Sequence, residues 1–361
     1  MAGLSKIPSA GFQDNVKFRN IIINGDMSIA QRGTSATGIT SNTYATVDRF
    51  RTVASSLGTW TQSQSTDVPS GQGFISSLKM DCTSANASPS ASSNLGIQQK
   101  FEGQNLQYLK KGTSSAESLT LSFWVKSNKT GTYIAEFFDN DNARQISQAY
   151  TISSANTWEK KTLTYDGDTS GALGNDNGNS LLVQFWLGTG SNYSSGTLST
   201  TWTANTNTNR APGQVNLADS TSNEWYITGV QLEAGQTASE FEFLPHDVNK
   251  TRCFRYFQDL APKKNDCRIA IGENVNGTRC DPVFQYVEKR ANPSVTFTAA
   301  NTFSLYNAGT SRDCTSMSSD NFSEICGNLN ANVSSGLTPT GGASQFITNG
   351  TGSQIFVDAE L

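Results

Sequence analysis

Two runs of strictly alternating side chains constrain this chain more than any other feature. In residues 119–126 apolar side chains alternate with polar ones or with tryptophan, and residues 181–187 repeat the pattern apart from Leu182. A period of two is typical of a β-strand that buries one of its faces. The predicted buried faces are Leu119, Leu121, Phe123 and Val125 in the first run and Leu181, Val183, Phe185 and Leu187 in the second.

The rest of the chain contains short strand-like runs rather than long helical patterns. Candidate strands at residues 49–53, 58–63, 74–80 and 95–101 are separated by loops rich in Gly, Asn and Ser. This arrangement is typical of an antiparallel sandwich. We therefore predict an all-β protein, with an antiparallel jelly-roll sandwich followed by a short linker helix and a smaller C-terminal β-domain. The predicted boundaries are an N-terminal arm at 1–19, the sandwich at 20–245, the linker at 246–261 and the C-terminal domain at 262–361.

A strand and a helix are predicted to follow one another where the sandwich ends. The sequence EWYITGVQLEA begins at Glu224, and Gly235 ends the run. Asp247 then offers a side-chain oxygen to the free amides of a first helical turn, and near-helical spacings continue to Phe257, before Pro262. Strict alternation in the strand places Tyr226, Thr228, Val230 and Leu232 on one face and Ile227, Gly229 and Gln231 on the other.

The composition limits the classes of molecule that we expect this protein to bind. The chain is 35% hydrophobic, 10% aromatic and 16% charged, with a net charge of −4, which is not a disordered composition. Lys and Arg are scattered rather than gathered into a basic stripe, so nucleic acid is not an expected partner. No apolar run approaches the length of a membrane span, and the N-terminus lacks the apolar core of a signal peptide, so we expect the protein to be made and kept in the cytosol.

The six cysteines do not indicate a metal centre. None of them forms a CxxC pair, the tight spacing from which zinc sites usually draw two ligands. Disulfides in the C-terminal region would form only after release into an oxidising medium. Folding in a reducing cytosol favours buried free thiols.

Several motifs resemble a β-sandwich module of bacteriophage tail-fibre and other virion proteins. They are IIINGDMSIAQRGTS at residues 21–35, Asp48-Arg49-Phe50, SFWVKSNKTGTY at 122–133, NTWEKKTLTY at 156–165 and VQLEAGQTASEFEF at 230–243. The resemblance implies a virion protein assembled in the host cytoplasm. It also implies a homotrimer, an arm that attaches to other virion proteins of the tail or neck, and β-domains that contact a host receptor.

The jelly roll also resembles carbohydrate-binding modules, which often hold a structural calcium ion. That resemblance makes Asp26 and Glu233 the candidate metal ligands.

The sequence offers little for catalysis. His246 is the only histidine, and the chain has no GxGxxG before a helix, no GxxxxGK[ST] and no HExxH. We therefore expect no enzymatic activity. A glycan-cleaving enzyme needs only two facing carboxylates, for which Glu102, Glu136 and Asp139 are the candidates; solvated charges at loops and strand edges are the plainer interpretation.

Carbohydrate binding without catalysis is the sharper hypothesis. Trp124 and Trp186 fall on the polar faces of the two alternating strands, where an indole could stack on a sugar ring, with Lys126 and Gln184 beside them as hydrogen-bonding groups. Tyr193 and Trp202 lie in the long polar connection at residues 188–209, and aromatic loops on a rigid β-scaffold are frequent binding surfaces. The alternative is that these tryptophans pack under loops or against a sister subunit.

The sequence thus predicts a non-enzymatic phage virion protein, a tail fibre or receptor-binding component that contacts a host surface glycan. One alternative is a head, portal or neck decoration protein with the same fold. The other is a glycan-degrading enzyme of the tailspike type.

Overall fold

The computed structural model describes residues 18–261, 263–338 and 341–361, which form two compact units. The first unit contains the chain up to Ser28, Ser35–Ala45 and Phe50–Pro245, and the second contains Ile29–Thr34, Thr46–Arg49 and His246–Leu361. The predicted arm of residues 1–19 lies outside the described residues except for Phe18 and Arg19. The main division falls next to the predicted end of the sandwich, but two short early segments belong to the second unit.

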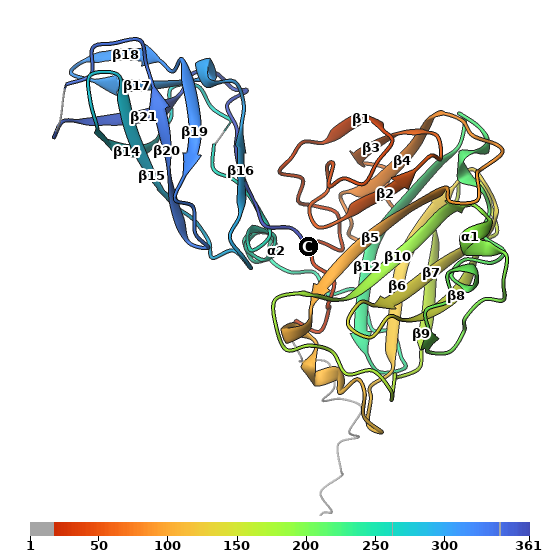
Figure 1. Cartoon of the computed structure of the whole chain (residues 1–361). Helices are drawn as coiled ribbons and strands as arrows, with labels where there is room; N and C mark the ends of the chain where they lie inside the picture. The colour runs from red at the N-terminus through yellow and green to blue at the C-terminus, as the bar shows by residue number, and fades with distance from the viewer. Residues whose placement is uncertain (1–17, 262, 339–340) are drawn as a thin grey trace, which may run out of the picture. The chain divides into compact units, whose positions relative to one another are not determined.

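The first unit is built from two six-stranded antiparallel sheets, which we call sheet A and sheet B (Figure 1). In spatial order, sheet A consists of β1 (Ser35–Ile39), β3 (Thr59–Ser65), β4 (Ser77–Ser84), β12 (Glu224–Ala234), β6 (Leu119–Ser127) and β9 (Glu159–Tyr165). Sheet B consists of β11 (Thr203–Ala204), β8 (Arg144–Ile152), β7 (Gly131–Asp139), β10 (Asn179–Thr189), β5 (Asn94–Glu102) and β2 (Arg51–Ser55).

Consecutive strands of the first unit mostly alternate between the two sheets, as in a jelly roll. The strands β4 and β6 lie in sheet A, whereas β5 and β7 lie in sheet B. The connections contain only short helices: η3 (Gly103–Asn105), η4 (Gln107–Leu109), α1 (Ser191–Ser194), η5 (Asn207–Asn209) and η6 (Leu217–Asp219). The prediction of an all-β jelly-roll sandwich is therefore confirmed.

The core of the first unit lies between the sheets. The inward side chains of β6 and β10 are at most 5% exposed, as the alternation of both runs predicted. Phe123 of β6 and Phe185 of β10 meet edge to face across the sandwich, with ring centroids 5.1 Å apart. This burial forces the residues in between, including Trp124 and Trp186, onto the outer faces of their sheets.

Strict alternation in β12 is a wrong prediction. Thr228 pairs with Trp124, which faces outward, whereas Leu232 pairs with Leu121, which faces the core. The register of β12 against β6 shifts between Thr228 and Gln231, and Gly229 within that interval has a left-handed φ of 61°. A β-bulge therefore moves the alternation by one residue, so Val230 and Leu232 do not share a face with Tyr226 and Thr228.

The second unit confirms the predicted helix and the smaller β-domain. Helix α2 (His246–Phe254) begins one residue earlier than the predicted cap, so Asp247 lies within its first turn. The helix ends at Phe254 instead of continuing, and Phe257 begins strand β13 (Phe257–Asp259). Pro262, expected to stop the helix, lies outside the described residues.

Two antiparallel sheets follow α2 in the second unit. The smaller has the order β13, β22 (Ile355–Asp358) and β16 (Ser294–Phe297). The larger has the order β18 (Thr310–Asp313), β17 (Phe303–Asn307), β21 (Ala343–Thr348), β14 (Arg268–Asn274), β15 (Arg279–Gln285), β20 (Cys326–Asn332) and β19 (Ser316–Asp320), and η7 (Ala300–Thr302) precedes β17. All six cysteines are free thiols, four of them buried. No helix in the described ranges has the length and apolar character needed to cross a membrane.

Two arginines from the early segments join the C-terminal residues of the second unit. The Arg32 guanidinium lies 3.4 Å from the ring centroid of Phe257 and pairs with Asp358 at 2.9 Å and Glu360 at 3.5 Å. The Arg49 guanidinium lies 3.4 Å from the ring centroid of Tyr256 and also pairs with Glu360.

We call Arg32, Arg49, Asp358 and Glu360 the arginine clasp. It gives a structural role to the QRGTS and Asp-Arg-Phe motifs, because Arg32 belongs to the first and Arg49 to the second. Burial of both guanidiniums and of Glu360 makes the pairing interdependent: removing one partner leaves the opposite charge desolvated and uncompensated.

The clasp predicts a specific loss of stability in the second unit. We expect Glu360→Gln to lower its free energy of unfolding by about 3 kcal/mol, because Arg49 would keep a buried charge without its full partner. Asp281→Asn is the matched control, because it breaks the more exposed pair with Arg279 and should cost less than about 1 kcal/mol. Tryptophan occurs only in the first unit, so hydrogen exchange of the β22 amides is the suitable measurement. Equal effects of the two substitutions would contradict the role of the clasp.

A buried lysine makes the stability of the second unit depend on pH. Lys289 is 1% exposed, and its ammonium donates hydrogen bonds to the carbonyl oxygen of Phe254 and, at 3.2 Å, to Gln258 Oε1. Burial lowers the pKa of Lys289 to about 7. Above that pH the folded protein releases a proton that the unfolded chain still holds, so stability should rise with pH until the unfolded pKa is reached.

We expect the second unit of the wild type to gain about 1–2 kcal/mol relative to Lys289→Met between pH 7 and pH 9. The difference between the two proteins isolates this one group from every other titration. Hydrogen exchange of the second unit at both pH values is the measurement. A pH-independent difference would show that Lys289 remains charged throughout.

Candidate functional site

The outer face of sheet A carries a row of side chains centred on Trp124. In β6, Trp124 pairs with Lys160 of β9 on one side and with Thr228 of β12 on the other. Directly opposed residues in antiparallel strands share a face, so all three point away from the core. Trp124 is half-buried and Lys160 is exposed.

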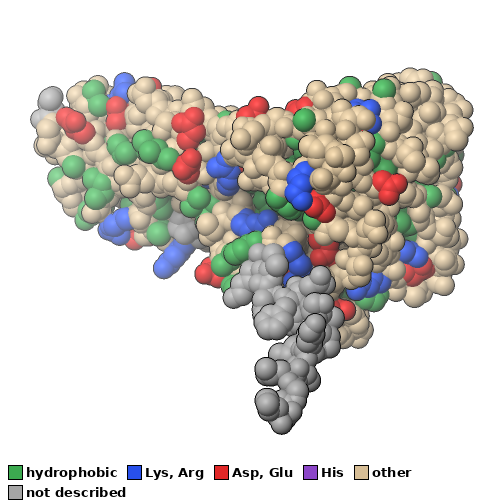
Figure 2. Space-filling view, turned by 90° about the horizontal axis from the view of Figure 1, so that it is seen from below, with side chains coloured by type: hydrophobic (Ala, Val, Ile, Leu, Met, Phe, Trp, Pro, Cys, Tyr) green, Lys and Arg blue, Asp and Glu red, His purple; other side chains and the backbone are tan. Residues whose placement is uncertain are grey.

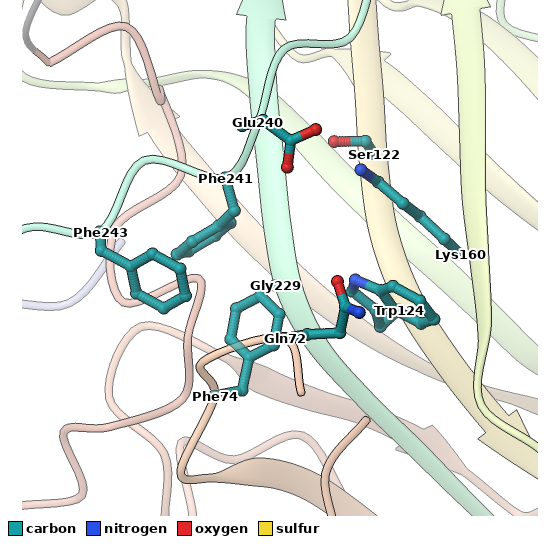
Figure 3. A pocket seen from close by; sticks show the side chains of 9 residues that line it. All are labelled: Gln72, Phe74, Ser122, Trp124, Lys160, Gly229, Glu240, Phe241 and Phe243. Carbon is teal, nitrogen blue, oxygen red and sulfur yellow. The ribbon is translucent and has the colours of Figure 1, made fainter. Parts of the chain in front are cut away.

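A cavity of about 250 Å³ opens on this face beside Trp124. Figure 3 shows Trp124 and Lys160 on one side of it, Phe241 and Phe243 on the other, and Glu240 toward one end. We call this cavity the Trp124 pocket, and its lining residues are Gln72, Phe74, Ser122, Trp124, Lys160, Gly229, Glu240, Phe241 and Phe243.

Three phenylalanines form the wall that faces Trp124. The ring centroid of Phe74 lies 5.1 Å from those of Phe241 and Phe243, and the latter two are 4.8 Å apart. Phe74 is 7% exposed, whereas Phe243 is 51% exposed. The wall is thus anchored by Phe74 and presents the aromatic surface of Phe243 to solvent.

Two opposite charges of the pocket are uncommitted. Among the described residues, neither the Lys160 ammonium nor the Glu240 carboxylate is engaged in a hydrogen bond or an ion pair. Glu240 contributes only its backbone oxygen to neighbouring groups, accepting from Arg19 at 2.5 Å and from Gln231 at 3.2 Å. The pocket therefore combines a free donor, a free acceptor and an indole face.

The bulge in β12 forms the floor of the pocket. A Cβ atom on Gly229 would lie 2.6 Å from Cζ of Phe74, closer than real contacts allow. Glycine is therefore required both by the left-handed φ and by the ring that rests on the backbone. The bulge follows the outward-facing Thr228 and returns Leu232 to the core face of the strand.

Lys126 shares the outer face of sheet A with Trp124 but already has a partner. Its ammonium pairs with Asp67 and lies 4.3 Å from the ring centroid of Tyr226. Trp158 Nε1 donates to the same carboxylate at 2.9 Å. Burial raises the pKa of Tyr226 to about 12, so its phenol is neutral at physiological pH. These side chains form a polar network on the same face of sheet A, and none of them lines the Trp124 pocket.

The structure separates Trp186 and Gln184 from Trp124, because β10 belongs to sheet B. Trp186 is 2% exposed and donates from Nε1 to Glu136 at 2.9 Å. The Tyr193 ring centroid lies 5.4 Å away, and Arg210 lies 5.3 Å from the indole. Trp186 therefore packs beneath the long polar connection, which is the alternative that the sequence left open, and its faces are covered by protein.

The remaining predicted binding residues also lie elsewhere. Gln184 is 3% exposed and accepts from Gln98 Nε2 at 3.2 Å on the outer face of sheet B. Trp202 donates from Nε1 to the backbone oxygen of Asp166 at 2.8 Å, and its ring lies 4.6 Å from the Lys111 ammonium. Of the six residues predicted for carbohydrate binding, only Trp124 lines the pocket.

The predicted candidates for glycan cleavage are buried carboxylates. Glu136 accepts two hydrogen bonds from Arg210, at 2.7 and 3.0 Å, and Asp139 pairs with Lys111. Glu102 accepts from Gln104 Nε2 at 2.7 Å. All three are 0% exposed, so they are interior charges rather than the solvated edge charges that the sequence suggested. His246 is exposed at the start of α2 in the second unit.

The two candidate calcium ligands are not brought together. Asp26 lies beside Thr228, whose hydroxyl donates to its backbone oxygen at 3.4 Å. Glu233 lies farther along β12 and accepts from the backbone and hydroxyl of Ser239, at 2.7 and 2.6 Å. Within the described ranges, no group of three or more His, Cys, Asp or Glu residues is arranged to hold a metal ion.

Most of the pocket was missed by sequence reasoning. Phe241 and Phe243 alternate with acidic residues in SEFEF, a period-two pattern that could have marked a second aromatic face. Gly229 inside a strand pattern was a signal for a bulge. Gln72 and Phe74 come from the loop before β4, and nothing in the sequence places that loop beside β12.

Comparisons with known proteins give only distant likenesses. No protein-family model matches the chain, and no curated protein matches it. The enzymatically active domain of tailspike protein 4 from bacteriophage CBA120 is 15% identical with a TM-score of 0.31, over 60% of this chain and 21% of that one. A putative sugar-binding protein from Bacteroides thetaiotaomicron is 12% identical with a TM-score of 0.34, over 60% of this chain and 99% of that one.

A carbohydrate-binding module, TmCBM61, solved with β-1,4-galactotriose, is 9% identical with a TM-score of 0.29, over 60% of this chain and 99% of that one. The chain spans about a fifth of the tailspike chain that it matches. The assignment of the fold therefore depends on the sheet order and register described above.

The pocket floor makes Gly229→Ala a direct test of the bulge. We expect the substitution to lower the stability of the first unit by about 2–3 kcal/mol, because it combines a strained φ with a clash against Phe74. Gly213→Ala is the matched control, since Gly213 has a φ of 85° but nothing within 4 Å of the added methyl, and should cost about 1 kcal/mol. Urea unfolding followed by tryptophan fluorescence reports the first unit alone, and equal losses would contradict the contact with Phe74.

Proposed function

We propose that this protein binds carbohydrate at the Trp124 pocket without cleaving it. The observation that carries the proposal is a half-buried indole at the mouth of a small cavity, beside an ammonium and a carboxylate that have no partner within the described part of the chain. An indole face stacks on the apolar face of a sugar ring, while charged groups exchange hydrogen bonds with its hydroxyls. Binding sites for small ligands characteristically combine apolar walls with a few convergent polar groups in this way.

The charge of the pocket supports a neutral ligand. Lys160 and Glu240 contribute one charge of each sign, so neither a polyanion nor a polycation gains net attraction. In Figure 2 acidic and basic side chains both occur on a surface that is mostly uncharged. Both features support binding of an uncharged polysaccharide in preference to nucleic acid.

The chemistry of the lining supports a binding role. Glycoside hydrolysis by the usual mechanisms uses two carboxyl groups on opposite sides of the scissile bond. Glu240 is the single carboxylate among the lining residues of the Trp124 pocket. The buried carboxylates of Glu136 and Asp139 form ion pairs with Arg210 and Lys111, respectively, and neither residue lines the Trp124 pocket.

The proposal extends to the biological setting through the motif resemblance. We infer a phage virion component, a tail fibre or receptor-binding protein, that contacts a host surface glycan through the first unit. The same resemblance supports a homotrimer assembled in the host cytoplasm, with residues 1–19 attaching to tail or neck proteins. Labelled electron microscopy of virions tests this setting against the alternative of a head, portal or neck decoration protein.

Substitution of Trp124 tests the binding role. We expect Trp124→Ala to weaken binding of the purified chain to its best ligand in a panel of bacterial surface polysaccharides by at least about tenfold, because the stacking face is lost. Trp186→Phe should leave that binding unchanged, since its indole is covered by Tyr193 and Arg210. Surface plasmon resonance with immobilised polysaccharide is the measurement. Failure of the wild type to bind any member, or unchanged binding by Trp124→Ala, would refute the proposal.

A reducing-end assay with the same polysaccharides tests the absence of cleavage. We expect no release by the wild type. Release that is abolished by Glu240→Gln would establish an enzyme of the tailspike type instead.

A further inference from the structure

The Trp124 pocket has two walls of different chemistry, and a plain sugar uses only one of them. Trp124 offers a flat face for the ring, while Lys160, Gln72 and Glu240 offer hydrogen bonds to hydroxyls. The opposite wall of Phe74, Phe241 and Phe243 offers only apolar aromatic surface. Hydroxyl groups placed against that wall would lose water without gaining a hydrogen bond.

The exposure of Phe243 needs an explanation. A phenylalanine that only anchored the chain would be most stable with its ring covered, yet half of Phe243 remains accessible beside the cavity. The ring packs against Phe74 and Phe241, at 5.1 and 4.8 Å between centroids. The exposed surface of Phe243 is thus available to a ligand.

We propose that the pocket selects an N-acetylhexosamine. The sugar ring stacks on Trp124, the acetamido methyl packs against Phe241 and Phe243, and the amide lies between Glu240 and Lys160. This inference rests on the proposed function of the pocket and names the sugar class that the pocket recognises.

The polar groups of the pocket can pair with both the donor and the acceptor of an amide. An acetamido group presents one N–H donor and one carbonyl acceptor, so it needs one acceptor and one donor from the protein. The Glu240 carboxylate is such an acceptor and the Lys160 ammonium such a donor, and neither is engaged within the described residues. A hydroxyl at the same place can also pair with these groups, but it carries no methyl to cover the phenylalanine wall, so the acetamido group gains the apolar contact as well.

The size of the cavity agrees with one substituted ring. Its volume of about 250 Å³ lies just below the range of about 300–1,000 Å³ that is usual for sites of drug-sized ligands. The pocket therefore binds a single sugar residue of a longer polysaccharide. The neighbouring sugar residues lie over the outer face of sheet A.

Matched sugar pairs test the inference with the full chain. Isothermal titration with methyl β-glycosides of N-acetylglucosamine and N-acetylgalactosamine is compared with the corresponding glucoside and galactoside, which differ only in the acetamido group. We expect at least one acetamido sugar to bind about tenfold or more tightly than its partner, because a buried methyl and a paired amide both contribute. A methyl L-rhamnoside distinguishes recognition of any methyl group from recognition of the amide.

Variants of Phe243 separate this inference from the proposed function. Phe243→Ser should reduce the preference for the acetamido sugar about fivefold, whereas Phe243→Leu should retain most of it, and the exposed position makes misfolding of either variant checkable by tryptophan fluorescence. Equal binding of both members of each pair, tightest binding of the rhamnoside, or no binding of any of these sugars would overturn the inference. The polysaccharide binding by wild type and Trp124→Ala would still decide the proposed function independently.

Discussion

The burial of one face of β6 is the constraint on which the candidate site depends. Leu121, Phe123 and Val125 are fully buried between the sheets, and Phe123 meets Phe185 there. Because side chains alternate along a strand, this burial places Ser122 and Trp124 on the outer face with no freedom to turn inward. A large aromatic residue at such a position is not needed by the core. The core therefore fixes the backbone from which the stacking face projects, which reduces the entropy lost when a ligand binds.

The bulge at Gly229 makes that outward-facing tryptophan part of a pocket. A regular β12 would continue the flat surface of sheet A, whereas the extra residue brings the backbone against the ring of Phe74. Phe74 in turn supports Phe241 and Phe243, which follow β12 in the chain. One glycine thus links the strand register, the aromatic wall and the shape of the cavity. The loop before β4 and the segment after β12 contribute from far apart in the sequence.

Patterns with a period of two predicted the fold well, because they follow directly from burial of one face. These patterns predicted the inward residues of β6 and β10 and the jelly-roll class. The structure separates the residues of the predicted binding site, because the exposure of an outward residue depends on what covers it. Trp124 remains open, whereas Trp186 is covered by Tyr193 and Arg210 from a connection with no regular pattern. The arginine clasp could not be predicted from the sequence either, because only the folded chain brings Arg32 and Arg49 to Glu360.

The indole N–H signals of the protein provide the most direct test of the central claim that Trp124 contacts sugar. Each of the six tryptophans contributes one such signal to a nitrogen-correlated NMR spectrum, and titration with a bound glycan identifies those that sense the ligand. The account predicts a large shift of the Trp124 signal and none for Trp186, whose N–H is committed to Glu136. Saturable binding that moves the Trp186 signal, or that leaves Trp124 unmoved, would contradict it.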